Sequence, residues 1–460
     1  MTPLIANSLW FASCLPAAAA FHRATRDVAG TQRRVLRRIT GCRSVAEFQE
    51  RMPLSDEPGL PREPILRCVP TSGTTAATKS IPYTAALLRE FQAGIAPWIA
   101  DLFRHQAGLI RGRSYWSISP VGETGAGFAD DTAYLGRAGR WVAATLAVPP
   151  AVRHLRSLEE WRRETLRHLV GCRDLAFVSV WHPSFLTLLV EPLRREELTT
   201  LWPNLRVISC WADAAAAQPA AELARLFPQA RIQPKGLIAT EGFVSLPLWD
   251  RDGAALAVRS HFFEFLADDG RARLAHELAR GGEYSVVLTT SGGLCRYRLR
   301  DRVRVTGFEN ECPLLRFIGK EHQVSDRFGE KINETQVGAA LAGVAAEFMI
   351  VACEGHRYTL FIQAAAQTDT ELAALGERLE TALQQNVHYH YCRDLGQLGP
   401  VGVFRVASHG QTRYLTACQA HGQPLGNIKP LRLQREGGWG KVFEGHYVIG
   451  GIHQVHEGIA

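Results

Sequence analysis

The stretch from residue 152 to residue 238 most constrains the fold, because amphipathic helical patterns alternate there with short, continuously apolar runs. Charged residues at helical spacing predict a helix over Val152–Val170, and another is expected over Ala220–Phe227. Runs that are apolar throughout are typical of strands buried on both faces of a parallel sheet. We therefore expect an α/β architecture with strands at Leu175–Val180, Leu205–Cys210 and Arg231–Ile238.

The pattern changes twice further along the chain. From Phe243 to Phe317, short strand-like runs follow one another, which indicates an antiparallel or barrel-like part. After Gly319, helical and strand patterns alternate again, so we expect a hinge near Lys320. The predicted organisation is a large domain over residues 1–320 and a smaller one over residues 321–460.

Composition sets broad limits on function. The chain has 460 residues, 46% hydrophobic and 21% charged, as in an ordinary globular protein. Its net charge is +7, and no nucleic-acid-binding motif accompanies that mild excess, so neither a nucleic-acid nor a membrane partner is expected. Ten Cys without a C-x-x-C pair indicate a reduced, cytoplasmic protein. The oligomeric state is left open, with a monomer as the default expectation.

The apolar run Leu9–Phe21 needs a separate decision. No Lys or Arg precedes it, so the charged region that opens a signal peptide is missing. The run is also too short to span a bilayer. We expect it to be the first core helix, continuing past Arg23 and Arg26.

A loop rich in hydroxyl-bearing residues, Thr71–Lys79, is the first candidate site segment. Its backbone N–H groups and hydroxyls could approach phosphate oxygens, and Lys79 would add a positive charge. A Walker A motif needs Gly directly before the Lys, and Thr78 stands there instead. Without other segments, a plain surface loop is the alternative.

The second segment ends in Thr240-Glu241-Gly242, directly after an expected strand. Ligands bind at the carboxyl ends of strands in open α/β sheets. A carboxylate at that place can hold Mg²⁺ against ATP phosphates. The alternative is a Thr-Glu pair that only caps a helix.

Two more segments complete the set. Asp301, in Cys295–Asp301 and expected at a strand start, could accept both ribose hydroxyls of a nucleotide, or could merely form surface ion pairs with neighbouring Arg residues. Lys429 precedes Pro430, which favours extended backbone. A Lys on a small mobile domain could neutralise charge on the α-phosphate and a carboxylate, whereas most single Lys residues are simply exposed.

In this order, the four segments resemble the adenylate-forming enzymes. Five intervening stretches narrow the resemblance to the auxin-responsive-promoter (Gretchen Hagen) family of acyl acid–amido synthetases, and more closely to its bacterial members. These stretches are Trp116–Pro120, Gly127–Leu135, Leu201–Leu205 with Ile208–Trp211, Phe317–Lys320 and Gly329–Glu334. The resemblance extends from about residue 8 to residue 450.

The resemblance implies a large N-terminal domain of β-sheets and a β-barrel flanked by helices, and a small C-terminal lid that rotates between half-reactions. It implies that a carboxylic acid is adenylated with release of pyrophosphate, and that an amine, expected to be an amino acid, then displaces AMP. ATP and Mg²⁺ are the expected cofactors, with Glu241 as the metal ligand and Lys429 and Glu241 as catalytic residues. The ATP set is Thr71, Ser72, Gly73, Thr74, Thr75, Lys79, Thr240, Glu241, Asp301, Arg316 and Lys429.

The acyl pocket should be lined by apolar and aromatic side chains. The candidates, each of which could instead be plain core, are Trp116, Trp181, Phe185, Trp211 and Phe243. Two departures stand out: Ala76 and Ala77 stand where the adenylate-forming enzymes have Gly, and Arg300 replaces the Gly that usually precedes the Asp of its motif.

Several alternatives stay open. An acyl-CoA ligase shares the first half-reaction, and a non-catalytic nucleotide-binding protein would share the fold. Glu334 and His322 are weak candidates for the base that activates the amine. The alternating His388, His390 and Cys392 would suit a zinc site on a strand, but no fourth ligand is evident.

Overall fold

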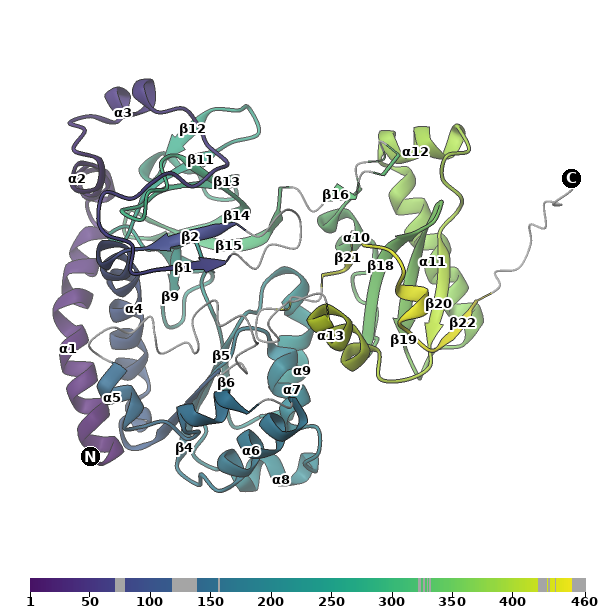
Figure 1. Cartoon of the computed structure of the whole chain (residues 1–460), viewed down its shortest axis with the longest axis horizontal. Coiled ribbons are helices and arrows are strands. Elements are labelled where there is room, and N and C mark those ends of the chain that lie inside the picture. Colours follow the sequence, from purple (N-terminus) through teal and green to yellow (C-terminus); the bar gives the residue numbers. More distant parts are fainter. Residues whose placement is uncertain are drawn as a thin grey trace, which may run out of the picture. The chain divides into compact units, whose positions relative to one another are not determined.

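The computed structural model describes residues 1–70, 79–117, 139–155, 158–321, 324–325, 327–328, 330, 332–420, 428, 431–434 and 436–448. The described chain up to Ile318 forms one compact unit, and a second begins at Gly319. Each unit has its own apolar core and is considered by itself below. Figure 1 traces both along the sequence.

A four-stranded parallel sheet in the first unit accounts for the alternating pattern. Its order is β3-β4-β5-β6, and every residue of β4 and β5 is buried. The carboxyl ends of all four strands therefore lie at one edge. The elements are β3 (Arg113–Trp116), α5 (Gly139–Ala143), α6 (Leu158–Val170), β4 (Leu175–Ser179), α7 (Pro183–Val190), α8 (Arg195–Leu201), β5 (Val207–Cys210), α9 (Ala217–Leu226) and β6 (Arg231–Pro234).

The segment expected to be antiparallel forms a seven-stranded sheet in the order β12-β11-β13-β14-β15-β10-β9. The paired strands all run antiparallel where their register is described. The strands are β9 (Ser245–Pro247), β10 (Ala254–Leu256), β11 (Phe262–Leu266), β12 (Ala272–Leu274), β13 (Glu283–Thr289), β14 (Tyr297–Glu309) and β15 (Cys312–Lys320). Two hairpins accompany it: β1 (Arg67–Pro70) with β2 (Ser80–Tyr83), and β7 (Ile238–Ala239) with β8 (Gly242–Phe243).

Helices form the start of the chain. They are α1 (Pro3–Ala24), α2 (Val28–Thr40), α3 (Val45–Arg51) and, after the first hairpin, α4 (Ala85–His105). Asp27, Ser44 and Thr84 cap three of them by accepting a backbone N–H with the side chain. Helices α1 and α4 run side by side (Figure 1).

Helix α1 begins earlier than the predicted run, at Pro3, but ends at Ala24, so the expected continuation past Arg26 is wrong. Its 22 residues are long and apolar enough to cross a membrane by length and composition, so the expectation of a run too short to span is wrong. One face nevertheless packs inside the unit, where Trp10 meets Phe103 edge to face at 5.6 Å. Asn7, 4% exposed, donates to the carbonyl oxygens of Leu109, Ile110 and Gly112. One side of α1 thus packs in the core of the first unit, and the compartment stays a prediction.

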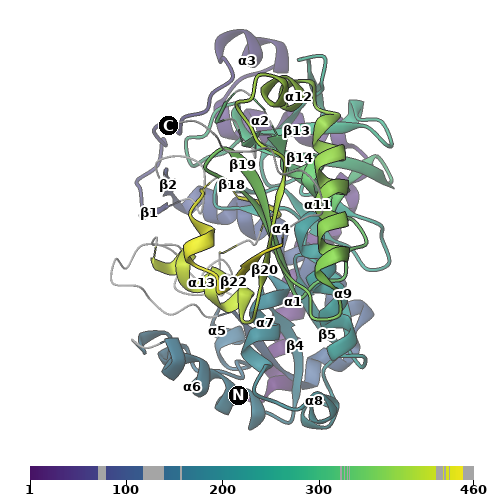
Figure 2. The same ribbon diagram turned by 90° about the vertical axis from the view of Figure 1, so that its right-hand side faces the viewer.

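The second unit is a five-stranded sheet, in the order β21-β18-β19-β20-β22, with helices on both faces (Figure 2). Leu372 and Leu379 of α11 share a cluster with Val351, whereas Tyr414 of α13 packs on Phe348. The elements are β16 (Val324–Ser325), β17 (Ile332–Asn333), α10 (Glu334–Ala340), β18 (Phe348–Glu354), β19 (Arg357–Gln363), α11 (Asp369–Gln384), α12 (Val387–Asp394), β20 (Gly402–Val406), α13 (Gly410–Ala420), β21 (Leu433–Gln434) and β22 (Gly445–Tyr447).

Candidate functional site

The loop with Thr240 and Glu241 is the turn of the β7–β8 hairpin, and two side chains hold it from opposite ends. The hydroxyl of Tyr83 donates to the carbonyl oxygen of Thr240 at 2.6 Å. The backbone N–H of Phe243 donates to Nε2 of His261 at 3.0 Å. A Cβ on Gly242 would lie 3.0 Å from that same nitrogen, so the site favours glycine. The hairpin is therefore fixed around Glu241.

A buried carboxylate contacts the His261 ring nitrogen that does not face the hairpin. The His261 ring is fully buried, and its Nδ1 lies 2.9 Å from the Glu90 carboxylate. Because Nε2 accepts a hydrogen bond, Nδ1 carries the proton and donates to Glu90. Glu90 also accepts the N–H and the hydroxyl of Ser291, at 3.1 and 2.6 Å. Sequence reasoning missed this chain of contacts, since Glu90 and His261 are 171 positions apart.

Lys79, directly after the hydroxyl-rich loop, lies next to acidic and aromatic groups. Its ammonium donates to the carbonyl oxygen of Asp56, lies 3.5 Å from the Glu57 carboxylate and sits 5.6 Å from the ring centre of Tyr297. Burial raises the pKa of the Tyr297 hydroxyl, and the charges of Glu241, Asp56 and Glu57 raise it further. Lys79, Glu241 and the start of β14 thus share one electrostatic neighbourhood.

Asp301 lies inside β14, not at a strand start as predicted. It is 3% exposed. The pairing of β13 with β14 shifts between Ser285 and Val287, so β14 carries an irregularity around Asp301. Arg300 is left-handed there, with φ of 62°. Arg300 therefore adopts the left-handed backbone that a Gly at this position would favour. Its guanidinium pairs with Asp56 at 2.8 Å.

We expect Arg300→Gly to be more stable than Arg300→Ala by about 1 kcal/mol, since a left-handed conformation costs a residue with a Cβ about 1–2 kcal/mol and costs Gly almost nothing. Both variants lose the ion pair with Asp56, so that loss cancels in the comparison. Urea unfolding of the two variants measures the difference. Equal stabilities, or a more stable Ala variant, would show that the left-handed backbone is not retained in solution.

Arg316 occupies a different position on β15. It pairs with Asp252, and its Nε lies 4.0 Å from the Asp213 carboxylate. Burial raises the pKa of Asp213 to about 6, against the opposing effects of the Phe317 N–H and the Arg316 charge. Arg316 therefore sits among carboxylates, and its place in the ATP set stays a prediction.

The aromatic candidates divide into two groups. Trp116, Trp181 and Trp211 follow or end strands at the carboxyl edge of the parallel sheet, and the Trp181 and Trp211 rings are 5.4 Å apart. Phe185, by contrast, packs on Trp161 in a separate cluster, and Phe243 packs on Phe91 in the main core. Only the three Trp residues gather where a ligand of such a sheet would bind.

Several predicted residues lie outside the described part of the chain. They are Thr71, Ser72, Gly73, Thr74, Thr75, His322 and Lys429.

Glu334 is tied to the segment that follows Lys429. At the first turn of α10, its carboxylate accepts the backbone N–H groups of Arg432 and Leu433 at 2.7 and 2.6 Å. Burial raises the pKa of Glu334 to about 7, against those two hydrogen bonds and the charge of Arg432. These contacts indicate a positioning role for Glu334, and its use as the base for the amine stays a prediction.

The expected strand with alternating His residues is wrong. His388, His390 and Cys392 lie on α12, a helix that Asn386 caps by accepting the N–H of His388. Residues two apart on a helix point in different directions, so this spacing no longer suits a shared metal. Within the described ranges, no group of three or more His, Cys, Asp or Glu could hold a metal ion.

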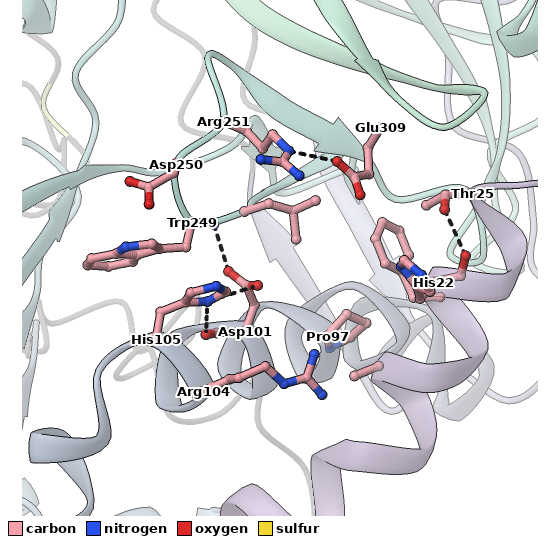
Figure 3. A pocket seen from close by; sticks show the side chains of 13 residues that line it. His22, Thr25, Pro97, Asp101, Arg104, His105, Trp249, Asp250, Arg251 and Glu309 are labelled. Carbon is pink, nitrogen blue, oxygen red and sulfur yellow. Dashed lines mark hydrogen bonds and ion pairs between the residues drawn. The ribbon is translucent and has the colours of Figure 1, made fainter.

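A pocket of about 200 Å³ lies elsewhere in the first unit, between α1, α4 and the loop after β9 (Figure 3). There Asp101 accepts the N–H of Trp249 at 2.7 Å, and the His105 and Trp249 rings stack at 6.0 Å. None of the predicted ATP or acyl residues lines this pocket.

Comparisons with known proteins identify two domains. The GH3 family central domain matches residues 254–320, and the GH3 family C-terminal domain matches residues 333–437. A rice protein, the probable indole-3-acetic acid-amido synthetase GH3.9, is 30% identical over 154 residues, which cover 31% of this chain and 35% of that protein. A mouse GH3 domain-containing protein is 28% identical over 235 residues, which cover 45% of this chain and 44% of that protein. The chain thus spans less than half the length of these relatives.

Solved structures extend the likeness in fold to nearly the whole chain. A GH3.15 acyl acid amido synthetase superposes with a TM-score of 0.78 at 16% identity, covering 94% of this chain and 96% of that one. A 2-hydroxyisobutyryl-CoA ligase in its postadenylation state superposes with a TM-score of 0.53 at 15% identity, covering 92% of this chain and 89% of that one. The predicted adenylate-forming fold is confirmed, while the narrower resemblance to bacterial members stays a prediction. The central and C-terminal domains of the GH3 family thus both match this chain, in that order.

Proposed function

We propose that this protein is an ATP-dependent acyl acid–amido synthetase. The observation that carries the proposal is the gathering of Lys79, Glu241 and Tyr297 beside the hairpin that Tyr83 and His261 hold in place. These residues come from three separate segments of the chain. The two matched GH3 domains and the names of the relatives support the same chemistry.

The residues present suit ATP and Mg²⁺ by the chemistry of their donors. Asp301, a nearly buried carboxylate, would accept ribose hydroxyls, and Lys79 would contact phosphate oxygens. Glu241 would hold Mg²⁺, which prefers a carboxylate together with phosphate oxygens and would neutralise phosphate charge. Thr240 and Arg316 complete the proposed ATP set among the described residues.

In the first half-reaction, an oxygen of the substrate carboxylate attacks the α-phosphorus of ATP, and pyrophosphate leaves. The side chains need supply no covalent chemistry, since orientation and charge neutralisation lower the barrier. Lys429 would neutralise the charge that develops on the carboxylate and the α-phosphate. The Glu90–His261 pair would act only by positioning, because it holds the backbone next to Glu241.

In the second half-reaction, an amine attacks the acyl-adenylate carbonyl and AMP leaves, giving an amide. An amino acid is the proposed amine. An acyl-CoA ligase is the rival, since a CoA ligase shares this fold. The family match favours the amide synthetase, because the GH3 central and C-terminal domains are the ones found here.

Acid-dependent ATP–pyrophosphate exchange with pooled carboxylic acids tests the first half-reaction. We expect exchange with at least one pool, and splitting that pool identifies the acid. AMP release is then measured with pooled amino acids and, separately, with CoA. Turnover with CoA alone would favour the ligase, and ATP binding by calorimetry without exchange would favour a non-catalytic nucleotide-binding protein.

A further inference from the structure

A row of buried polar side chains crosses the carboxyl end of the parallel sheet. Ser179 of β4 pairs in register with Ser209 of β5, which pairs with Gln233 of β6. Residues paired in register point to the same face of a sheet, so the three side chains stand next to one another. Ser179 and Ser209 are fully buried, and Gln233 is 4% exposed. In β4 and β5, these serines interrupt strands that are otherwise apolar.

Two groups in this row have no hydrogen-bond partner in the part of the chain that the structure describes. They are the hydroxyl of Ser209 and the side-chain nitrogen of Gln233. The orientation of the Gln233 amide follows from its oxygen, which accepts the indole N–H of Trp98 at 2.9 Å. Its NH₂ group is therefore a donor without a partner. Buried donors of this kind are rare and call for a specific explanation.

A buried cation completes the row. Lys235 directly follows β6 and continues the ladder, since its N–H donates to the carbonyl oxygen of Cys210 at 2.8 Å. It is two residues from Gln233 and shares its face. The side chain is 6% exposed, and its ammonium lies 2.8 Å from the Ser179 hydroxyl. The same ammonium lies 4.5 Å from the ring centre of Trp181 and 5.7 Å from that of Trp98.

These groups are donors that converge between aromatic rings. An ammonium, an amide NH₂ and two hydroxyls match the oxygens of a carboxylate. The place is also the carboxyl edge of the sheet, beside Trp181 and in register with Trp116, where the acyl candidates gather.

We propose that Lys235, with Ser209 and Gln233, holds a second carboxylate at the far end of the acyl substrate. The substrate class is then dicarboxylic acids, with one carboxylate adenylated and the other bound by this row. This inference rests on the proposed function, because it names the acid for the same reaction. Lys235 would determine specificity and take no part in the adenylation chemistry.

Matched pairs of acids test the proposal: hexanoate with adipate, and phenylacetate with 4-carboxyphenylacetate. ATP–pyrophosphate exchange gives kcat/KM for each acid. Quenching of tryptophan fluorescence gives the affinity for each acid without turnover. In wild type, we expect the dicarboxylate to be favoured about 100-fold in at least one pair, since a site built to bind a polar group strongly rejects an analogue that lacks it. Lys235→Met should bring the ratio to about 1.

Two milder variants guard against a misfolded Lys235→Met. Gln233→Glu keeps the oxygen that accepts the hydrogen bond from Trp98 and places a negative charge where the NH₂ group stood. This variant should therefore lose activity with the dicarboxylate and keep its activity with the matched monocarboxylate. Ser209→Ala should lower the preference about 10-fold. Lys441→Met, at an exposed Lys in the second unit, is the control and should leave the ratio unchanged.

The outcomes separate this inference from the proposed function. If wild type exchanges with monocarboxylates equally well and no variant changes the ratio, the dicarboxylate subsite is wrong and the synthetase proposal stands. If neither acid supports exchange but the dicarboxylate quenches fluorescence in wild type and not in Lys235→Met, the subsite stands and the synthetase proposal falls. Equal fluorescence responses in wild type and Lys235→Met overturn the subsite.

Discussion

Replacing Lys429 with alanine is expected to lower acid-dependent ATP–pyrophosphate exchange by about 100- to 1000-fold, the usual effect of removing one group that stabilises transition-state charge. ATP affinity should change far less. The reason is that charge on the α-phosphate and the attacking carboxylate must be neutralised chiefly while the new bond forms. A single ammonium at that point therefore acts on the rate more than on binding.

The described residues on either side of Lys429 are well anchored. Ile428 is 2% exposed. Leu433 pairs with Val351 of β18, and the Glu334 carboxylate accepts the N–H groups of Arg432 and Leu433.

Exchange rates of wild type, Lys429→Ala and Lys429→Arg are compared, with ATP affinity measured by calorimetry. The Arg variant should be intermediate, since a planar guanidinium keeps the charge but not the shape of an ammonium. Lys441→Ala, at an exposed Lys, is the control. Undiminished exchange in Lys429→Ala would remove Lys429 from the mechanism, and a parallel loss of ATP binding would make it a binding residue instead.

Local pattern predicted the elements of this fold well where apolar spacing was regular. The apolar runs around Phe177 and Ile208 became fully buried parallel strands, as continuous runs predict. The antiparallel character of the segment from Phe243 to Phe317 was also predicted correctly. By contrast, the His388–Cys392 run alternates in sequence yet forms a helix, because Asn386 caps it and Tyr389 and Cys392 supply a buried face at helical spacing.

From the sequence, candidate site residues could be proposed only where they belong to a short local motif. Thr240 and Glu241 were found from their motif, but their supports were not, since Tyr83 and His261 are distant in sequence and show no local signal. Asp301 was expected at a strand start, and its place inside β14 depends on a register shift that follows from sheet pairing. Lys235 carries no signal in the sequence, because its position beside Ser179 follows from the pairing of the strands.

Glu334 should make the stability of the second unit depend on pH. Burial raises the pKa of this carboxyl in the folded state to about 7, from an ordinary value of 4.5. Between these values, the folded state keeps a proton that the unfolded chain has lost, so the free energy of unfolding falls as pH rises. The stabilisation is complete below about pH 4.5 and is lost as pH passes 7, a decrease of roughly 3 kcal/mol.

Amide hydrogen exchange, corrected for intrinsic rates, measures this decrease in peptides from β18 and β19 between pH 4.5 and 7. Peptides from β13, in the first unit, serve as the internal control and should show no matching change. Glu334→Gln removes the titrating group. Its NH₂ would face one of the two N–H donors and lower stability at every pH. The protection of β18 and β19 in this variant should nevertheless not change with pH. A variant whose protection still falls by the wild-type amount would show that another group titrates. A flat wild-type profile would mean that the two backbone N–H groups keep Glu334 ionised, because hydrogen bonds to a carboxylate favour its charged form and oppose the effect of burial.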